Sequence, residues 1–281
     1  MTYLTAGIDA GTPVRLYYED NRAPGTTGDP VVLIHGWLQS GRTWEAQVEA
    51  LVADGHRVIT YDRRGFGQSS MPWGGYNFDV FAADLDAVLT HLDLHDVTLV
   101  GFSNGGGDVA RYLGTFGSGR VSKAVFASAT PPFIYWAPGN PAGRLTDDVI
   151  SYLQNTLRAD RPAFIDHMVS DMFTPTGGEE LVSKPTHDYA AAIALSASPK
   201  GTIDCVEAWK TDFRADLAAI DIPTLILHGD SDHVLPVDAT GRRTHDAVKD
   251  STLVLIPGGP HAICTTHPQK FNAALVAFLA A

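Results

Sequence analysis

Apolar residues follow two alternating patterns along the chain. Short runs of branched and aromatic residues without polar alternation are typical of parallel strands buried on both faces. The clearest runs are Val31–Ile34, Val58–Tyr61, Val97–Phe102, Ser122–Ala127, Pro223–Leu227 and Thr252–Ile256. Segments with helical periodicity lie between them, such as Phe78–Leu92, which follows Asn77 as a predicted N-cap. Strands and helices that alternate through short links predict an α/β fold with a mostly parallel, doubly wound sheet.

The two ends of the chain complete this sheet. Leu4–Tyr18 contains two strand-like pieces around Gly11-Thr12-Pro13, which predicts an antiparallel hairpin at the sheet edge. Together with the apolar runs, this hairpin gives an expected total of eight strands. A final helix is expected over Pro268–Ala281.

The middle of the chain departs from the alternating pattern. From Pro131 to about Asp216 there is no buried strand run, and helical patterns occupy Val149–Leu157 and Pro162–Phe173. Breaks are expected at Gly177-Gly178 and at Pro199. The sequence therefore predicts an α/β core formed by residues 1–130 and 217–281, with a helical cap, residues 131–216, inserted between two strands.

Composition narrows the class of protein. The 281 residues are 44% hydrophobic and 19% charged, as in ordinary globular proteins, and 32 acidic against 20 basic side chains give a net charge of −12. A surface of this charge repels nucleic acid and anionic membranes. Neither a signal peptide nor an apolar run of membrane-spanning length is present, so a cytoplasmic protein is expected. Cys205 and Cys264 are interpreted as buried filler, and no spacing of His, Cys or Asp indicates a metal site.

Candidate chemistry begins at the run Val97–Phe102, which ends directly at a serine flanked by glycines. The pattern Gly101-x-Ser103-x-Gly105 is that of a nucleophile elbow, a sharp turn from strand to helix that lifts the serine oxygen above the sheet edge. Glycines are needed two residues either side, because the two backbones come too close for a Cβ atom. Ser103 is therefore the candidate nucleophile.

A serine nucleophile needs a base and an acid to orient it. His261 follows the last predicted strand in a Gly/Pro-rich loop and is the candidate base. Asp232 is preferred over Asp230 as the acid, because two further residues let its loop turn back over the sheet edge. Asp230 is expected to bond the backbone of its own turn. His35 and His228 also end strands, and we interpret both as loop-bracing residues bonded to backbone.

The transition state of acyl transfer also needs two amide donors. The backbone N–H of Asn104, directly after the nucleophile, is one candidate, and that of Trp37, in the loop after His35-Gly36, is the other. The Trp37 indole is expected to line the pocket. The loop Asp62–Ser69 is predicted to be held by ion pairs of its two arginines rather than to bind an anion.

Several segments together resemble one particular family. It is the α/β-hydrolase group of cofactor-free (non-heme) haloperoxidases, perhydrolases and aryl esterases, which also contains γ-lactamases. The resemblance lies in His35-Gly36-Trp37, Asp62-Arg63-Arg64-Gly65-Phe66-Gly67-Gln68-Ser69, Gly101-Phe102-Ser103-Asn104-Gly105-Gly106-Gly107, Thr202-Ile203-Asp204-Cys205, Thr211-Asp212-Phe213-Arg214 and His228-Gly229-Asp230-Ser231-Asp232. It implies the α/β-hydrolase fold, the triad Ser103, Asp232 and His261, and oxyanion amides at Trp37 and Asn104.

Two departures from the family pattern affect the expected activity. Members usually have methionine after the nucleophile, where this chain has Asn104, and members strong in perhydrolysis have proline where this chain has Leu38. We therefore rank ester hydrolysis above peracid synthesis. Expected apolar pocket walls are Phe102, Phe133, Trp136 and Leu195.

The sequence thus predicts a serine hydrolase that cleaves small carboxylic esters, with lactones as a further substrate class, through an acyl-enzyme. Promiscuous perhydrolase and haloperoxidase activity is expected beside it. A γ-lactamase is the alternative enzyme, and a non-catalytic protein that binds small molecules is the alternative from another class. No cofactor is expected, the partner is a small ester, lactone or lactam, and a homo-oligomer is left open.

Overall fold

The central sheet of the computed structural model, which describes residues 2–281, has eight strands in the order β1-β2-β4-β3-β5-β6-β7-β8. β1 and β2 pair antiparallel with their neighbours, and all other neighbours are parallel. The strands are β1 Thr2–Asp9, β2 Thr12–Asn21, β3 Gly28–Ile34, β4 His56–Tyr61, β5 Val97–Phe102, β6 Val121–Ala127, β7 Thr224–Gly229 and β8 Ser251–Ile256. The predicted mostly parallel sheet with an antiparallel N-terminal hairpin is confirmed.

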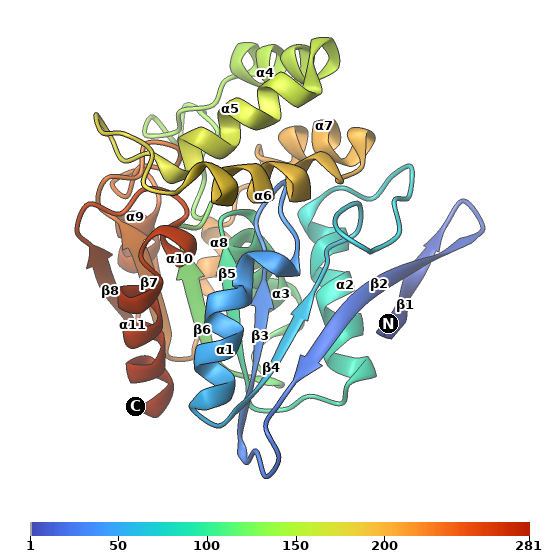
Figure 1. Ribbon diagram of the computed structural model, residues 1–281, viewed down its shortest axis with the longest axis vertical. Helices are drawn as coiled ribbons and strands as arrows, with labels where there is room; N and C mark the ends of the chain where they lie inside the picture. The colour runs from blue at the N-terminus through green and yellow to red at the C-terminus, as the bar shows by residue number, and fades with distance from the viewer. Residues whose placement is uncertain (1) are drawn as a thin grey trace.

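Helices cover both faces of this sheet (Figure 1). α1 and α11 pack together on one face, while α2, α3, α8 and α9 contact one another on the other face. The bounds are η1 Gly41–Trp44 (a 3₁₀ turn), α1 Glu45–Ala53, α2 Phe78–His91, α3 Asn104–Phe116, α8 Arg214–Ala218, α9 Gly241–Ala247, α10 Ile263–Thr266 and α11 Pro268–Ala280. Because both faces are covered, every residue of β5 and β7 is buried, which explains their unbroken apolar runs.

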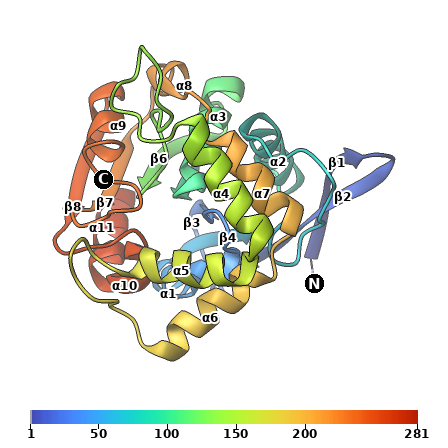
Figure 2. The ribbon, with the colours of Figure 1, turned by 90° about the horizontal axis from the view of Figure 1, so that it is seen from above.

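Four further helices form a layer over one end of the sheet (Figures 1 and 2). They are α4 Asp147–Ala159, α5 Arg161–Phe173, α6 Lys184–Leu195 and α7 Pro199–Ala208, all between β6 and β7 in the chain. We call this layer the cap. The break predicted at Pro199 is confirmed, because α6 ends at Leu195 and Pro199 begins α7, where its missing N–H is not needed. The domain boundary predicted between residues 216 and 217 lies inside α8, which packs against α3.

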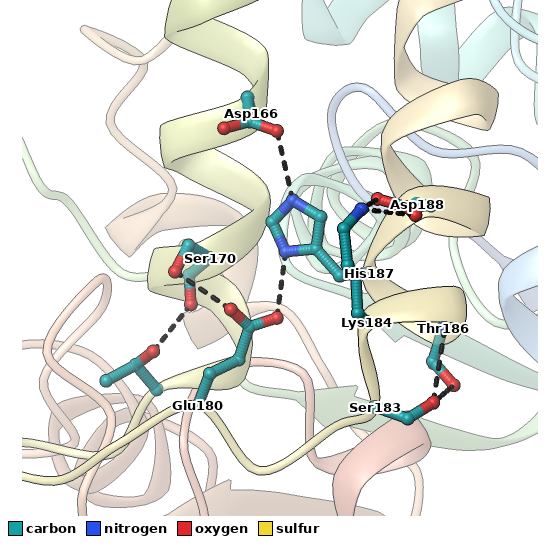
Figure 3. Close-up of polar contacts among 9 residues, drawn as sticks. Asp166, Ser170, Glu180, Ser183, Lys184, Thr186, His187 and Asp188 are labelled. Carbon is teal, nitrogen blue, oxygen red and sulfur yellow. Dashed lines mark hydrogen bonds and ion pairs between the residues drawn. The ribbon is translucent and has the colours of Figure 1, made fainter.

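A histidine between two carboxylates links the cap helices α5 and α6 (Figure 3). His187 Nδ1 lies 2.8 Å from Glu180 Oε1, and its Nε2 lies 3.1 Å from Asp166 Oδ1. Ser170 Oγ donates to the other Glu180 oxygen at 3.1 Å. Burial lowers the pKa of the His187 imidazole, but hydrogen bonds to Glu180 and Asp166 outweigh it, so the pKa is raised.

This bridge predicts a pH-dependent contribution to stability. Because the pKa of His187 is higher in the folded protein than in the unfolded protein, the stabilisation is fully present below the unfolded pKa near 6.5. It is lost as the pH rises through the folded pKa. Replacing His187 with glutamine should therefore lower the free energy of unfolding by roughly 0.5 kcal/mol more at about pH 5.5 than at about pH 8.5, since solvent screens the pair. Urea unfolding at both pH values measures this. The matched control is His167→Gln, an exposed histidine of α5 near one carboxylate; equal pH dependence in both variants would contradict the prediction.

Candidate active site

The turn after β5 has the geometry of a nucleophile elbow. Ser103 has φ 53° and ψ −118°, a strained conformation for a residue other than glycine, and α3 begins at the next residue. A Cβ atom on Gly101 would overlap the backbone of Gly105, and one on Gly105 would overlap the carbonyl of Ile34. The two glycines therefore allow α3 to approach β5 and β3 closely enough to hold the turn.

Two adjacent loops carry the candidate acid and base. Asp232 follows β7 and His261 follows β8, and these strands are parallel neighbours. The backbone N–H of Ser231 donates to the carbonyl of Gly259 at 3.1 Å, so the loops pack directly against each other. The carboxyl ends of parallel strands lie at one edge of the sheet, and this brings both loops to the edge that carries Ser103.

The three predicted side chains form one hydrogen-bonded chain. Ser103 Oγ lies 3.0 Å from His261 Nε2, and His261 Nδ1 lies 2.8 Å from Asp232 Oδ2. All three are buried. An ionised carboxylate accepts hydrogen bonds and cannot donate them, so the proton between Asp232 and His261 is on Nδ1 of the ring. Nε2 can then accept the proton of the Ser103 hydroxyl. This is the protonation state that a general base requires.

Asp232 is held as an anion by its surroundings. Its Oδ1 accepts the backbone N–H of Leu235 at 2.8 Å, and His228 Nε2 lies 3.3 Å from Oδ2. Burial raises the pKa of the carboxyl, but His261 and His228 outweigh it by charge and hydrogen bonding, so the pKa is well below its usual range. His228 braces its loop as predicted by bonding the carbonyl of Leu235 at 2.8 Å. Its contact with Asp232 was not predicted.

The hydrogen-bond partners of the Asp230 carboxylate differ from those expected. Its Oδ1 accepts the backbone N–H of Gly258 at 2.8 Å, in the loop after β8, and the hydroxyl of Ser231 at 3.1 Å, but no backbone group of its own turn. The expectation of a bond to the backbone of its own turn is wrong, because the loops after β7 and β8 pack against each other and the backbone donor comes from the second loop. Asp230 thus links the two loops.

The loop after β3 passes beside the nucleophile. A Cβ atom on Gly36 would lie 2.9 Å from Ser103 Cβ. His35 accepts the backbone N–H of Arg63 at Nε2 (2.9 Å) and lies 2.8 Å from the carbonyl of Gly36 at Nδ1. Burial, with the charge of Arg63, lowers the pKa of His35 to about 3, so the ring is neutral and donates from Nδ1. His35 therefore braces the loop that carries Trp37, as predicted.

Two backbone amides beside Ser103 are free to donate. Within residues 2–281, the backbone N–H groups of Trp37 and Asn104 have no protein acceptor. Asn104 is the first residue of α3, where N–H groups lack a helical partner, and the helix dipole favours negative charge. These are the two amides predicted for the oxyanion hole.

Buried ion pairs hold the Asp62–Ser69 loop, as the sequence predicted. Arg63 makes a two-pronged pair with Asp108 of α3, with N–O distances of 2.6 and 2.8 Å, and Arg64 pairs in the same way with Asp84 of α2. Because the Arg63 backbone also holds His35, this pair links α3 to the loop of Trp37.

Removing one partner of the Arg63–Asp108 pair should strongly destabilise the protein. Asp108→Ala leaves a guanidinium that is 1% exposed without its counter-charge, and such losses cost about 3 to 5 kcal/mol. Asp20→Ala is the matched control, because Asp20 makes a similar two-pronged pair with Arg57 on the surface. It should cost less than about 1 kcal/mol. Urea denaturation measures both values, and similar losses in the two variants would contradict the assignment.

A cavity of about 300 Å³ lies over Ser103, between core and cap. This volume is at the small end for sites that bind small molecules. Its floor includes Phe102, Ser103, Asn104 and His261, and the Trp37 indole lines it as predicted. The segment between β6 and β7, which contains the cap, supplies mainly apolar walls: Ile134, Leu145, Val149, Leu153, Met168, Met172 and Trp209.

Only one of the four pocket walls predicted from the sequence lies in this cavity. Phe102 lines it, whereas Phe133 is buried elsewhere with the Arg214 guanidinium 5.2 Å from its ring centre. Trp136 and Leu195 are 49% and 38% exposed and do not line it. These three expectations are wrong because the packing of the segment between β6 and β7 decides which of its side chains face the core, and this packing leaves no mark in the sequence pattern. The apolar face of α4 was the available signal for Val149 and Leu153.

Neither thiol of the chain belongs to the site. Cys264 and Cys205 are buried, and burial raises the pKa of each thiol to about 12, so both stay protonated. In the part of the chain that the structure describes, no group of three or more His, Cys, Asp or Glu side chains could hold a metal ion. Within the same residues, no helix combines the length and apolar character that crossing a membrane requires.

Comparison with known proteins defines the family. The α/β hydrolase fold family matches residues 29–268, and the chain belongs to this family. More narrowly, it is 40% identical to the non-heme chloroperoxidase of Kitasatospora aureofaciens, covering 95% of this chain and 96% of that protein. It is 34% identical to a bifunctional esterase/perhydrolase of Acinetobacter calcoaceticus, covering 99% of both chains. The crystal structure of a bromoperoxidase from Bacillus anthracis superposes with a TM-score of 0.95 at 49% identity, covering 100% of this chain and 99% of that one. The family resemblance drawn from the sequence is confirmed.

Proposed function

We propose that the protein is a serine hydrolase that cleaves small carboxylic esters through an acyl-enzyme. The observation that carries this proposal is the hydrogen-bonded chain from Ser103 through His261 to Asp232, which opens into a small apolar cavity. The names of the relatives, which include an esterase/perhydrolase, support the same chemistry.

The geometry supports a two-step reaction. His261 Nε2 accepts the Ser103 hydroxyl proton as the serine oxygen bonds to the ester carbonyl carbon. The backbone N–H groups of Trp37 and Asn104 donate to the oxyanion that forms. The C–O bond to the alcohol then breaks, and His261 returns the proton to the leaving oxygen. In the second step His261 takes a proton from water as the water oxygen bonds to the acyl carbon. The bond from that carbon to Ser103 Oγ then breaks, Ser103 regains the proton, and the acid leaves.

A perhydrolase activity follows from the same intermediate. Hydrogen peroxide can attack the acyl-enzyme in place of water, and the product is then a peracid, which oxidises halide without any group bound to the protein. The chloroperoxidase and bromoperoxidase names of the relatives support this secondary activity. It needs no residues beyond those already described.

Stopped-flow hydrolysis of a short-chain aryl ester tests the proposal. A burst of phenol equal to the enzyme concentration, followed by slower turnover, is expected because the reactive aryl leaving group makes acylation faster than deacylation. Parallel assays with a bicyclic γ-lactam and with acetate plus hydrogen peroxide rank lactamase and perhydrolase activities against esterase activity. Folded protein that turns over none of these substrates would contradict the proposal and favour a non-catalytic binding role.

A further inference from the structure

The amide side chain of Asn104 borders the largely apolar cavity and carries a buried donor without a partner. Asn104 is 2% exposed, lines the cavity, and directly follows the nucleophile. Its Nδ2 atom is buried and has no hydrogen-bond partner among residues 2–281. A buried donor without an acceptor is costly, and native proteins pair nearly all such groups. An unpaired donor in a cavity therefore indicates a group that a ligand completes.

A second donor in the same cavity has the same deficit. Trp209 lines the cavity from the cap, and its Nε1 is also buried without a partner. By contrast, the Trp37 indole in the same cavity is satisfied, since its Nε1 donates to the carbonyl of Thr202 at 3.1 Å. Both unpaired buried atoms among the lining side chains are donors, so the partner that each lacks is an acceptor.

The position of Asn104 limits which part of a substrate can supply this acceptor. Ser103 Oγ bonds to the ester carbonyl carbon, and the backbone N–H of Asn104 faces the carbonyl oxygen in the proposed reaction. The short Asn104 side chain starts from the same residue and reaches only atoms close to that carbon. Its terminal torsion is broad, so the amide can turn its nitrogen toward an acyl group.

From these contacts we propose that Asn104 selects esters whose acyl group carries an oxygen acceptor on the carbon next to the scissile carbonyl, such as 2-alkoxy and 2-hydroxy acids. The inference rests on the proposed function and adds the substrate class to it. Asn104 donates from Nδ2 to the acyl oxygen, while its backbone N–H donates to the oxyanion. A purely hydrocarbon acyl chain leaves Nδ2 unpaired in a desolvated site, and such chains are discriminated against.

Two aryl esters that differ in one atom test the proposal. The p-nitrophenyl esters of methoxyacetic and butyric acid have the same chain length, with an ether oxygen in place of one CH₂ group. The kcat/KM for the methoxyacetate is first divided by the kcat/KM for the butyrate. This ratio is then divided by the same ratio of the rates of hydrolysis by hydroxide, which removes the difference in chemical reactivity and gives the quotient to be measured. For the unaltered protein this quotient should be about ten, the effect of one paired buried donor.

Asn104→Leu replaces the amide by an apolar group of the same shape and should lower the quotient about tenfold, toward one. Thr240→Val is the matched control, because Thr240 lines the same cavity while its hydroxyl is already paired with the carbonyl of Pro236 at 3.2 Å. Its quotient should stay within about twofold of the unaltered protein. If Asn104→Leu does not fold, the quotient of the unaltered protein alone still decides.

The possible outcomes distinguish failure of the Asn104 proposal from failure of the esterase proposal. Turnover of both esters with a quotient of one or less in the unaltered protein, or an unchanged quotient in Asn104→Leu, would overturn the role of Asn104 and leave the esterase proposal intact. Absence of turnover of either ester by folded protein would overturn both.

Discussion

Replacing Ser103 with alanine should lower kcat for aryl ester hydrolysis by about 10⁴- to 10⁶-fold, while the free energy of unfolding stays nearly unchanged. The hydroxyl oxygen is the atom that bonds to the acyl carbon, so no acyl-enzyme can form without it. Donors of the oxyanion hole and binding in the cavity remain and account for the residual rate. Spectrophotometric release of phenol under saturating ester measures kcat.

Ser128→Ala provides the control for this substitution. Ser128 follows the neighbouring strand β6, is buried, also has positive φ, and has a hydroxyl with no hydrogen-bond partner among residues 2–281. It does not line the cavity. Its kcat should stay within about twofold of the unaltered protein. Comparable losses in the two serine variants, or a fully active Ser103→Ala protein, would show that another group is the nucleophile.

Asp232→Asn should lower kcat by about 10⁴-fold. An asparagine cannot supply the negative charge that stabilises the imidazolium of His261, and its amide favours the wrong tautomer of the ring. The free energy of unfolding should also fall. The pKa of the Asp232 carboxyl is lower in the folded protein, so the carboxylate stabilises the fold above its unfolded pKa, and this stabilisation is lost as the pH falls through the folded pKa.

Asp230→Asn is the comparison for this second prediction. Asp230 lies two residues earlier in the same loop and bonds the backbone N–H of Gly258, so it has a structural contact but no bond to His261. Its kcat should fall by less than about tenfold, because an asparagine oxygen can still accept that bond. Equal losses of kcat in the two variants would contradict the assignment of Asp232 as the acid.

The sheet and the hydrogen-bonded chain could be predicted because both depend on strong local signals. Unbroken apolar runs such as Val97–Phe102 occur where helices cover both faces of a parallel strand, and the ends of parallel strands share one edge. Ser103, Asp232 and His261 each follow such a run. Their convergence therefore follows from topology, without knowledge of any distance.

The cavity walls could not be predicted in the same way. Helices α4 and α5 were expected from their periodicity, but the angle at which they cross the sheet depends on side-chain packing between distant segments. Phe133 and Trp136 lie in the loop before α4, and Leu195 ends α6; the packing of these segments likewise leaves none of the three in the cavity. The bond from Gly258 to Asp230 was missed because it depends on how two loops pack, and the contact of His228 with Asp232 because it depends on the path of the loop after β7.

The central claim is that Ser103 becomes acylated, and intact-protein mass spectrometry after treatment with a fluorophosphonate tests it most directly. We expect one phosphonyl group per chain, located on Ser103 by peptide mapping, and no labelling of the Ser103→Ala protein. Folded protein that remains unlabelled, or that is labelled at a different residue, would contradict the account.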